Sequence, residues 1–192
     1  TVPRPVISNV HELLERVRIL IELESTSGLK IHRDYDPSIP EIILDPELMI
    51  QVFLNIARNA LQCLAEVPRP SLKFTTRTER QYTIGAKLHR IVTRVDIVDN
   101  GPGIPLDRRD DIYLEFQRLP IADAQAGKGL GLGLAIGQRM ARLLGHTIGL
   151  DSVIGRGSCF WINLPRGEAS PAITSATPDG DRQDALSGAR IL

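Results

Sequence analysis

The sequence contains few cysteines and no excess of charge of either sign. Two of its 192 residues are cysteine, and 23 Lys and Arg residues balance 23 Asp and Glu residues. Nucleic acids and anionic membrane surfaces attract proteins with a basic excess, so the zero net charge argues against both as general partners. Cys63 and Cys159 lie far apart within apolar runs, which indicates reduced thiols rather than a disulfide framework.

Long hydrophobic runs are also missing. No apolar stretch approaches the roughly 20 residues that a membrane-spanning helix needs. The first residues lack the apolar segment of a secretory signal peptide. We therefore expect a cytoplasmic globular domain without membrane contact, and a chain of this length can build one core of sufficient size without disulfides.

Hydrophobic periodicity predicts helices and strands over most of the chain. We expect helices over residues 10–25, 46–67 and 134–144, and strands over residues 30–35, 41–44, 72–78, 90–98, 147–153 and 158–164. Residues 99–133 are too rich in glycine, proline and charge for one regular element, and a loop of that length is usually functional or mobile. Residues 1–8 and 167–192 are predicted to be linkers that flank one domain at residues 9–166.

The predicted helix at residues 46–67 carries amides on the side opposite its apolar face. It begins with Asp45 as N-cap and Pro46 at the first helical position. The amide stripe consists of Gln51, Asn55, Asn59 and Gln62. An amide oxygen can bind Mg²⁺ directly or through water without placing negative charge beside a polyphosphate. The alternative is an ordinary polar helix face.

A second candidate site is the turn that follows the strand at residues 90–98. Asp99 continues the strand face that carries Val95 and Ile97, so its carboxylate needs a partner. The exocyclic amine of an adenine would supply a donor to this acceptor. Gly101 and Gly103 permit the turn and let a flat ligand approach the backbone. The same residues could also form a plain turn.

The third candidate is the glycine-rich segment at residues 127–136, which leads into a helix. Glycines and free amides at a helix start form an anion site that suits phosphates. A P-loop is excluded because Ala122 and Gly129 occupy positions that need Gly and Ser or Thr. A dinucleotide-binding fingerprint is excluded because no strand lies immediately upstream. A phosphate-binding loop of another fold remains.

Taken in order, four motifs resemble the N, G1, G2 and G3 boxes of sensor histidine kinases in the GHKL superfamily. They are Asn55…Asn59, Asp99-x-Gly-x-Gly103, Gly129-x-Gly-Leu-Gly-Leu134 and Gly155-x-Gly157. The resemblance covers residues 9–165. The part up to Pro105 is most similar to nitrogen-regulation sensor kinases, and the part from Tyr113 onward is more similar to hybrid kinases, which carry a receiver domain.

This resemblance implies a two-layer α/β sandwich of the histidine kinase and Hsp90 ATPase type, or Bergerat fold. Its mixed sheet would have helices on one face and a lid over ATP between the G1 and G2 boxes. The implied catalytic residues are Asn55, at the phosphate end, and Asn59, which would hold Mg²⁺. Asp99 would bind the adenine amine, and the base pocket would include Gly101, Gly103 and Ile104. The implied phosphate-binding and lid residues are Phe116, Lys128, Gly129, Leu130, Gly131, Leu132, Gly133 and Leu134.

One departure from the family pattern concerns charge near the phosphates. Many relatives carry Lys three residues after the Mg²⁺-binding Asn, where this chain has Gln62. Arg58 or a cation of the lid, such as Arg118 or Lys128, would have to supply that charge.

The implied activity is transfer of the γ-phosphoryl group of ATP to a histidine on a separate dimerisation domain, followed by relay to the receiver domain of a response regulator. Related ATPases carry a Glu where this chain has Asn55, and an amide cannot act as general base. Transfer is therefore favoured over hydrolysis. The alternative is a GHKL-type ATPase or a nucleotide-binding regulatory module. His11-Glu12 lacks the continuation of a phosphoacceptor motif, so structural or surface roles are expected for His11, His32, His89 and His146.

Overall fold

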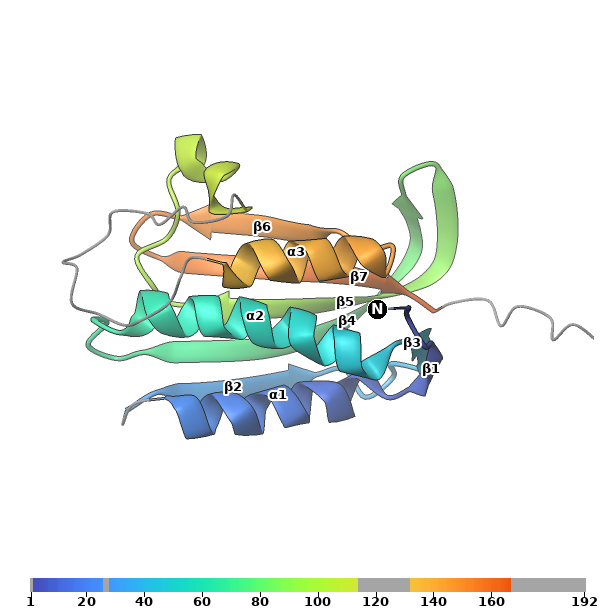
Figure 1. Cartoon of the computed structure of the whole chain (residues 1–192), viewed down its shortest axis with the longest axis horizontal. Coiled ribbons are helices and arrows are strands. Elements are labelled where there is room, and N and C mark those ends of the chain that lie inside the picture. The colour runs from blue at the N-terminus through green and yellow to red at the C-terminus, as the bar shows by residue number, and fades with distance from the viewer. Residues whose placement is uncertain (1, 26–27, 114–131, 167–192) are drawn as a thin grey trace, which may run out of the picture.

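The computed structural model describes residues 2–25, 28–113 and 132–166 and has two layers (Figure 1). Three helices pack on a five-stranded sheet, and a short two-stranded sheet lies at one end. The helices are α1 (Val10–Glu24), α2 (Pro46–Leu64) and α3 (Gly133–Leu143). The strands are β1 (Val6–Ser8), β2 (Lys30–Tyr35), β3 (Ile42–Leu44), β4 (Ser71–Ile84), β5 (Lys87–Asp99), β6 (Ile148–Val153) and β7 (Gly157–Pro165). Two 3₁₀ helices, Leu106–Arg108 and Asp111–Tyr113, follow β5.

The large sheet is mixed, as expected, and its strands have the order β2-β4-β5-β7-β6. β2 pairs parallel with β4, whereas the three remaining pairs are antiparallel. β5 and β7 therefore lie in the middle of the sheet, and the carboxyl end of β5 adjoins the amino end of β7. The predicted α/β sandwich with a mixed sheet is confirmed.

The helix starts follow the predicted capping residues. The side chain of Asn9 accepts a hydrogen bond from the His11 amide at 3.0 Å, and Asp45 accepts one from the Leu48 amide at 3.0 Å. The end predicted for the second helix was wrong, because α2 stops at Leu64 instead of continuing to Val67. Val67 precedes Pro68, and the proline ring disfavours helical geometry in the residue before it.

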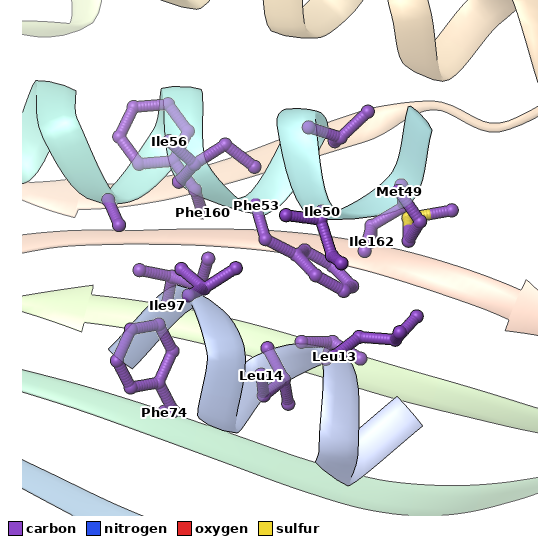
Figure 2. Packing of buried hydrophobic residues seen from close by; sticks show 14 of the residues in the cluster. Leu13, Leu14, Met49, Ile50, Phe53, Ile56, Phe74, Ile97, Phe160 and Ile162 are labelled. Atoms are coloured by element: carbon purple, nitrogen blue, oxygen red, sulfur yellow. The ribbon is translucent and has the colours of Figure 1, made fainter. Parts of the chain in front are cut away.

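The core lies between the helices and the sheet (Figure 2). α1 contributes Leu13 and Leu14, and α2 contributes Met49, Ile50, Phe53 and Ile56. The facing strands contribute Phe74, Ile97, Phe160 and Ile162. Each fully buried side chain of this size stabilises the fold by about 1.5–3 kcal/mol relative to exposure, so this layer holds the strand ends in fixed register. Among the described residues, no helix is long and apolar enough to cross a membrane.

Two parts of the fold differ from the sequence-based expectation. The strands predicted at 72–78 and 90–98 are longer than expected, because β4 and β5 continue to Ile84 and from Lys87 and form one long hairpin. A two-residue loop, in which Gly85 has φ of 60°, closes this hairpin. Residues 1–8 were predicted to be a linker, whereas Val6–Ser8 forms a strand that pairs antiparallel with Ile42–Leu44.

Candidate functional site

Helix α2 presents three polar side chains in a stripe toward the carboxyl end of β5 and the start of α3. The stripe consists of Asn55, Asn59 and Cys63, which share one side of the helix because they are four residues apart. Asn55 adjoins α3, where a Cβ on Gly137 would lie 3.2 Å from the Asn55 Cβ. Cys63 adjoins Gly101, whose Cβ would lie 3.3 Å from that of Cys63. Asn59 therefore lies between the start of α3 and the turn after β5.

The stripe predicted from the sequence contained Gln51 and Gln62 and did not contain Cys63. In the structure Gln51 and Gln62 are exposed, whereas Asn55, Asn59 and Cys63 are partly buried. Burial, together with the negative charge of Asp99, raises the pKa of the Cys63 thiol to about 11. The thiol is therefore protonated at neutral pH. The four-residue spacing of Asn55, Asn59 and Cys63 could have predicted that Cys63 lies on the same side of the helix. The thiol itself gave no indication of a role in the site.

Asp99 is buried at the carboxyl end of β5, on the same face as Val95 and Ile97. Its exposed fraction is only 5%, and its Oδ1 accepts a hydrogen bond from the Gly101 amide at 2.8 Å. Burial raises the pKa of this carboxyl, while the amides of Gly101 and Ser158 act in the opposite direction. The predicted burial of a carboxylate at this strand end is confirmed.

The two glycines after Asp99 leave no room for side chains. A Cβ on Gly101 would lie 2.8 Å from the Asp99 Oδ1. Gly103 has φ of 76°, and its Cβ would lie 2.2 Å from the Val153 carbonyl oxygen. Both positions therefore require glycine, and the turn brings backbone close to the Asp99 carboxylate. Ile104 follows and is buried, as is Leu134 at the start of α3.

Two serines beside Asp99 were not predicted as part of the site. Asp99 pairs with Ser158 across β5 and β7, and Ser158 pairs with Ser152 across β7 and β6. All three side chains are buried, with exposed fractions of 5–6%. They form a row of polar side chains, which we call the Asp99–Ser158–Ser152 row. Both serines alternate with apolar core residues in their strands, and this pattern could have been read from the sequence.

Ser152 connects this row to the turn after Gly103. Its Oγ accepts a hydrogen bond from the Ile104 amide at 2.8 Å, and its backbone carbonyl accepts one from the Arg109 guanidinium. The Gly155 amide donates to the Pro102 carbonyl at 2.7 Å. The turn after β5 and the β6–β7 turn therefore support each other.

Arg58 does not supply the charge that Gln62 lacks. Its guanidinium forms an ion pair with Glu24 at the end of α1, with Nε 2.9 Å from Oε2. The alternative cations, Arg118 and Lys128, lie outside the described residues, as do Phe116, Gly129, Leu130 and Gly131. Leu132 immediately precedes α3, and a Cβ on Gly133 would lie 3.8 Å from the Asn55 Oδ1.

The donor set of the site suits a magnesium nucleotide better than a metal bound by protein alone. Within residues 2–25, 28–113 and 132–166, no group of three or more His, Cys, Asp or Glu side chains could hold a metal ion. Mg²⁺ commonly takes few protein ligands and completes its shell with water and substrate phosphates. The amide oxygens of Asn55 and Asn59 fit that type of site.

Comparisons with known proteins point to one family. The model of the family described as histidine kinase-, DNA gyrase B-, and HSP90-like ATPase matches residues 44–168. The chain is 40% identical over 157 residues to the sensory histidine kinase/phosphatase NtrB of Vibrio alginolyticus, which is 82% of this chain and 43% of that protein. The chain thus spans less than half the length of this relative.

Solved structures show the same fold. Full-length ShkA in complex with AMPPNP matches with a TM-score of 0.65 and 25% identity, over 84% of this chain and 31% of ShkA. The catalytic domain of histidine kinase ThkA matches with a TM-score of 0.64 and 22% identity, over 85% of this chain and 96% of that domain.

Proposed function

Because the chain belongs to the histidine kinase-, DNA gyrase B- and HSP90-like ATPase family, we propose that it is the catalytic and ATP-binding domain of a two-component sensor histidine kinase. Residues 9–166 form this domain in our proposal. The observation that carries it is the buried Asp99 carboxylate, which is enclosed by a glycine turn and lies beside the amide stripe of α2. The 40% identity to a sensory histidine kinase/phosphatase favours the kinase branch of the family.

The described residues divide the proposed site into a base end and a phosphate end. At the base end, Asp99 accepts a hydrogen bond from the adenine amine, and Gly101 and Gly103 admit the flat ring. Ile104 supports the turn there because its backbone amide donates a hydrogen bond to the Ser152 Oγ. At the phosphate end, Gly133 adjoins Asn55. We propose phosphate-binding roles for the preceding residues, Lys128, Gly129 and Gly131, because a glycine-rich helix start presents free amides to anions.

We assign Asn59 as the Mg²⁺ ligand and Asn55 as its neighbour at the phosphates. Bound Mg²⁺ supplies charge neutralisation at the phosphoryl group that is transferred. The residues of this chain contribute positioning: Asp99 and Asn55 lie at opposite ends of the site and fix the nucleotide between them.

Transfer to another domain fits the site better than hydrolysis. Asn55 stands where related ATPases carry a Glu, and an amide cannot take a proton from water at neutral pH. The proposed acceptor is a histidine on a dimerisation domain of the same kinase, and the proposed final acceptor is an aspartate in a response regulator receiver domain. A cytoplasmic location of the domain is part of this proposal.

The proposal is tested by titrating the chain with Mg-ATP in a calorimeter. Wild type should bind, and Asp99→Asn should lose most of the binding because the variant places an amide donor near the adenine amine. Asp96→Asn is the matched control, since Asp96 lies on the opposite face of β5 and pairs with Arg94 at 2.8 Å. Equal binding by wild type and Asp99→Asn would contradict the site assignment.

A second measurement separates kinase from ATPase. With a dimerisation domain supplied in trans, labelled phosphate from ATP should appear on its histidine. Rapid ATP hydrolysis by the isolated chain, abolished by Asn55→Ala, would instead show the ATPase alternative. Nucleotide binding with neither reaction would indicate a regulatory binding module.

A further inference from the structure

The hydrogen bonds of the Asp99–Ser158–Ser152 row fix the direction of each hydroxyl. The Ser152 Oγ lies 3.0 Å from the Gly157 carbonyl oxygen, which can only accept, so the Ser152 hydroxyl proton points to Gly157. The same Oγ accepts from the Ile104 amide at 2.8 Å, because an amide N–H can only donate. Ser152 therefore has no proton left for a third contact.

The third contact of Ser152 is the Ser158 hydroxyl, whose Oγ lies 3.0 Å from that of Ser152. Since the Ser152 proton is already used, Ser158 must be the donor in this pair. A hydroxyl has one proton and two lone pairs, so Ser158 keeps only acceptor capacity. Ser158 is directly opposite Asp99 in the β5–β7 register, where Cβ atoms are about 4.5–5.5 Å apart. The base end of the site therefore presents two neighbouring acceptors.

We propose that Ser152 is a specificity-determining positioning residue, which makes Ser158 an acceptor and so selects a purine that carries an amino group at C6 over one that carries an oxygen there. This inference rests on the proposed nucleotide site. An amino group donates to both Asp99 and Ser158, whereas a 6-oxo group would place an acceptor against two acceptors. An acceptor left unsatisfied in a buried site costs more than a hydrogen bond contributes.

Removal of the Ser152 hydroxyl should relax this selection. In Ser152→Ala the Ser158 hydroxyl is free to rotate and to donate to an oxygen of the ligand. The experiment measures dissociation constants of Mg-ATP and Mg-inosine triphosphate, which carries oxygen in place of the amino group, with the full chain. The preference for ATP should fall by about three- to tenfold, the range expected for one neutral hydrogen bond.

Ser8→Ala is the matched control. Ser8 is also a buried serine, and its hydroxyl donates to the Val6 carbonyl at 3.1 Å in the short sheet far from Asp99. This variant should leave the ATP preference unchanged. An equal loss of affinity for both nucleotides in Ser152→Ala would show a purely structural role and overturn the inference.

Ser158→Ala provides a second test, and this test remains available in the case that Ser152→Ala does not fold. It removes the acceptor itself, so the ATP preference should fall, and adding Ser152→Ala should lower the preference no further because both act through one hydroxyl. An unchanged preference in Ser158→Ala, or independent additive effects in the double variant, would overturn the inference. If wild type bound neither nucleotide, the proposed function itself would fail instead.

Discussion

The two ends of strand β5 use polar residues in opposite ways. At its carboxyl end Asp99, Ser158 and Ser152 are buried, the Asp99 Oδ1 accepts from the Gly101 amide, and both serine hydroxyls have a defined direction. At its amino end the β4–β5 hairpin extends beyond the sheet and exposes most of its side chains (Figure 1). The same strand pair is thus tightly constrained where the candidate site lies and loosely constrained where it does not.

Glycines show the same contrast. Gly157 and Gly85 both have positive φ, at 107° and 60°. A Cβ on Gly157 would lie 1.9 Å from the Asp99 carbonyl oxygen, whereas a Cβ on Gly85 would meet nothing within 4 Å. Of these two glycines, Gly157 is required both for its backbone conformation and for its lack of a side chain, whereas Gly85 is favoured for its conformation alone.

The largest expected effect comes from alanine at these two positions. Gly157→Ala should lower the free energy of unfolding by at least about 3 kcal/mol, because a positive φ costs an L-residue about 1–2 kcal/mol and the methyl group must also displace backbone. Gly85→Ala should cost only about 1–2 kcal/mol for the positive φ, because a Cβ there meets no atom within 4 Å. Urea denaturation of both variants measures the difference, and equal losses would contradict the contrast between the two ends.

Lowering the pH should affect stability and ATP binding through different residues. Burial raises the pKa of Asp99 above its ordinary value of 3.8 and lowers that of His11 below its ordinary value of 6.5. His11 stacks on Tyr35 and its Nε2 lies 2.9 Å from the Thr76 Oγ1. Below pH 6.5 the unfolded chain binds more protons at His11 than the folded chain, so acid should lower stability through this residue. Acid should weaken ATP binding by protonating Asp99.

Two variants separate these titrations. His11→Phe retains an aromatic ring beside Tyr35 and should reduce the loss of stability between pH 7.5 and 5.5 while leaving the pH dependence of ATP binding in place. Asp99→Asn should raise the melting temperature at pH 7, because the elevated pKa means that ionisation of Asp99 opposes folding above that pKa. A lower melting temperature of Asp99→Asn would show that the carboxylate stabilises the empty protein.

The sequence allowed prediction of those parts of the site that depend on local pattern. Strand alternation placed Asp99 on the buried face, and capping residues gave the starts of α1 and α2. Ser152 and Ser158 face each other across the short β6–β7 turn, but their placement beside Asp99 and Ile104 depends on pairing between strands far apart in the sequence, which no local pattern specifies. The partner of Arg58 could not be predicted for the same reason, since Glu24 lies on another helix.

A smaller effect is expected for the Arg58–Glu24 pair, which tests whether Arg58 belongs to the site. Both side chains are about two-fifths exposed, so Arg58→Ala should cost no more than about 1 kcal/mol of stability. ATP affinity should stay unchanged, because the guanidinium is directed to α1. Glu24→Gln is the matched control. A strong loss of ATP affinity in Arg58→Ala, but not in Glu24→Gln, would show that Arg58 contributes charge at the phosphate end of the site.

The smallest effect is expected at the exposed end of β5. Leu88 is 62% exposed in the hairpin, so Leu88→Ser removes little buried surface and should change the free energy of unfolding by no more than about 0.5 kcal/mol. ATP affinity should also be unchanged, because Asp99 pairs with Leu72 of β4 and Ser158 of β7, which lie at the end of the sheet opposite the hairpin turn. Urea denaturation and calorimetry measure both quantities. A clear loss of ATP affinity would mean that the hairpin end of β5 influences the position of Asp99, and the two ends could then no longer be treated as independent.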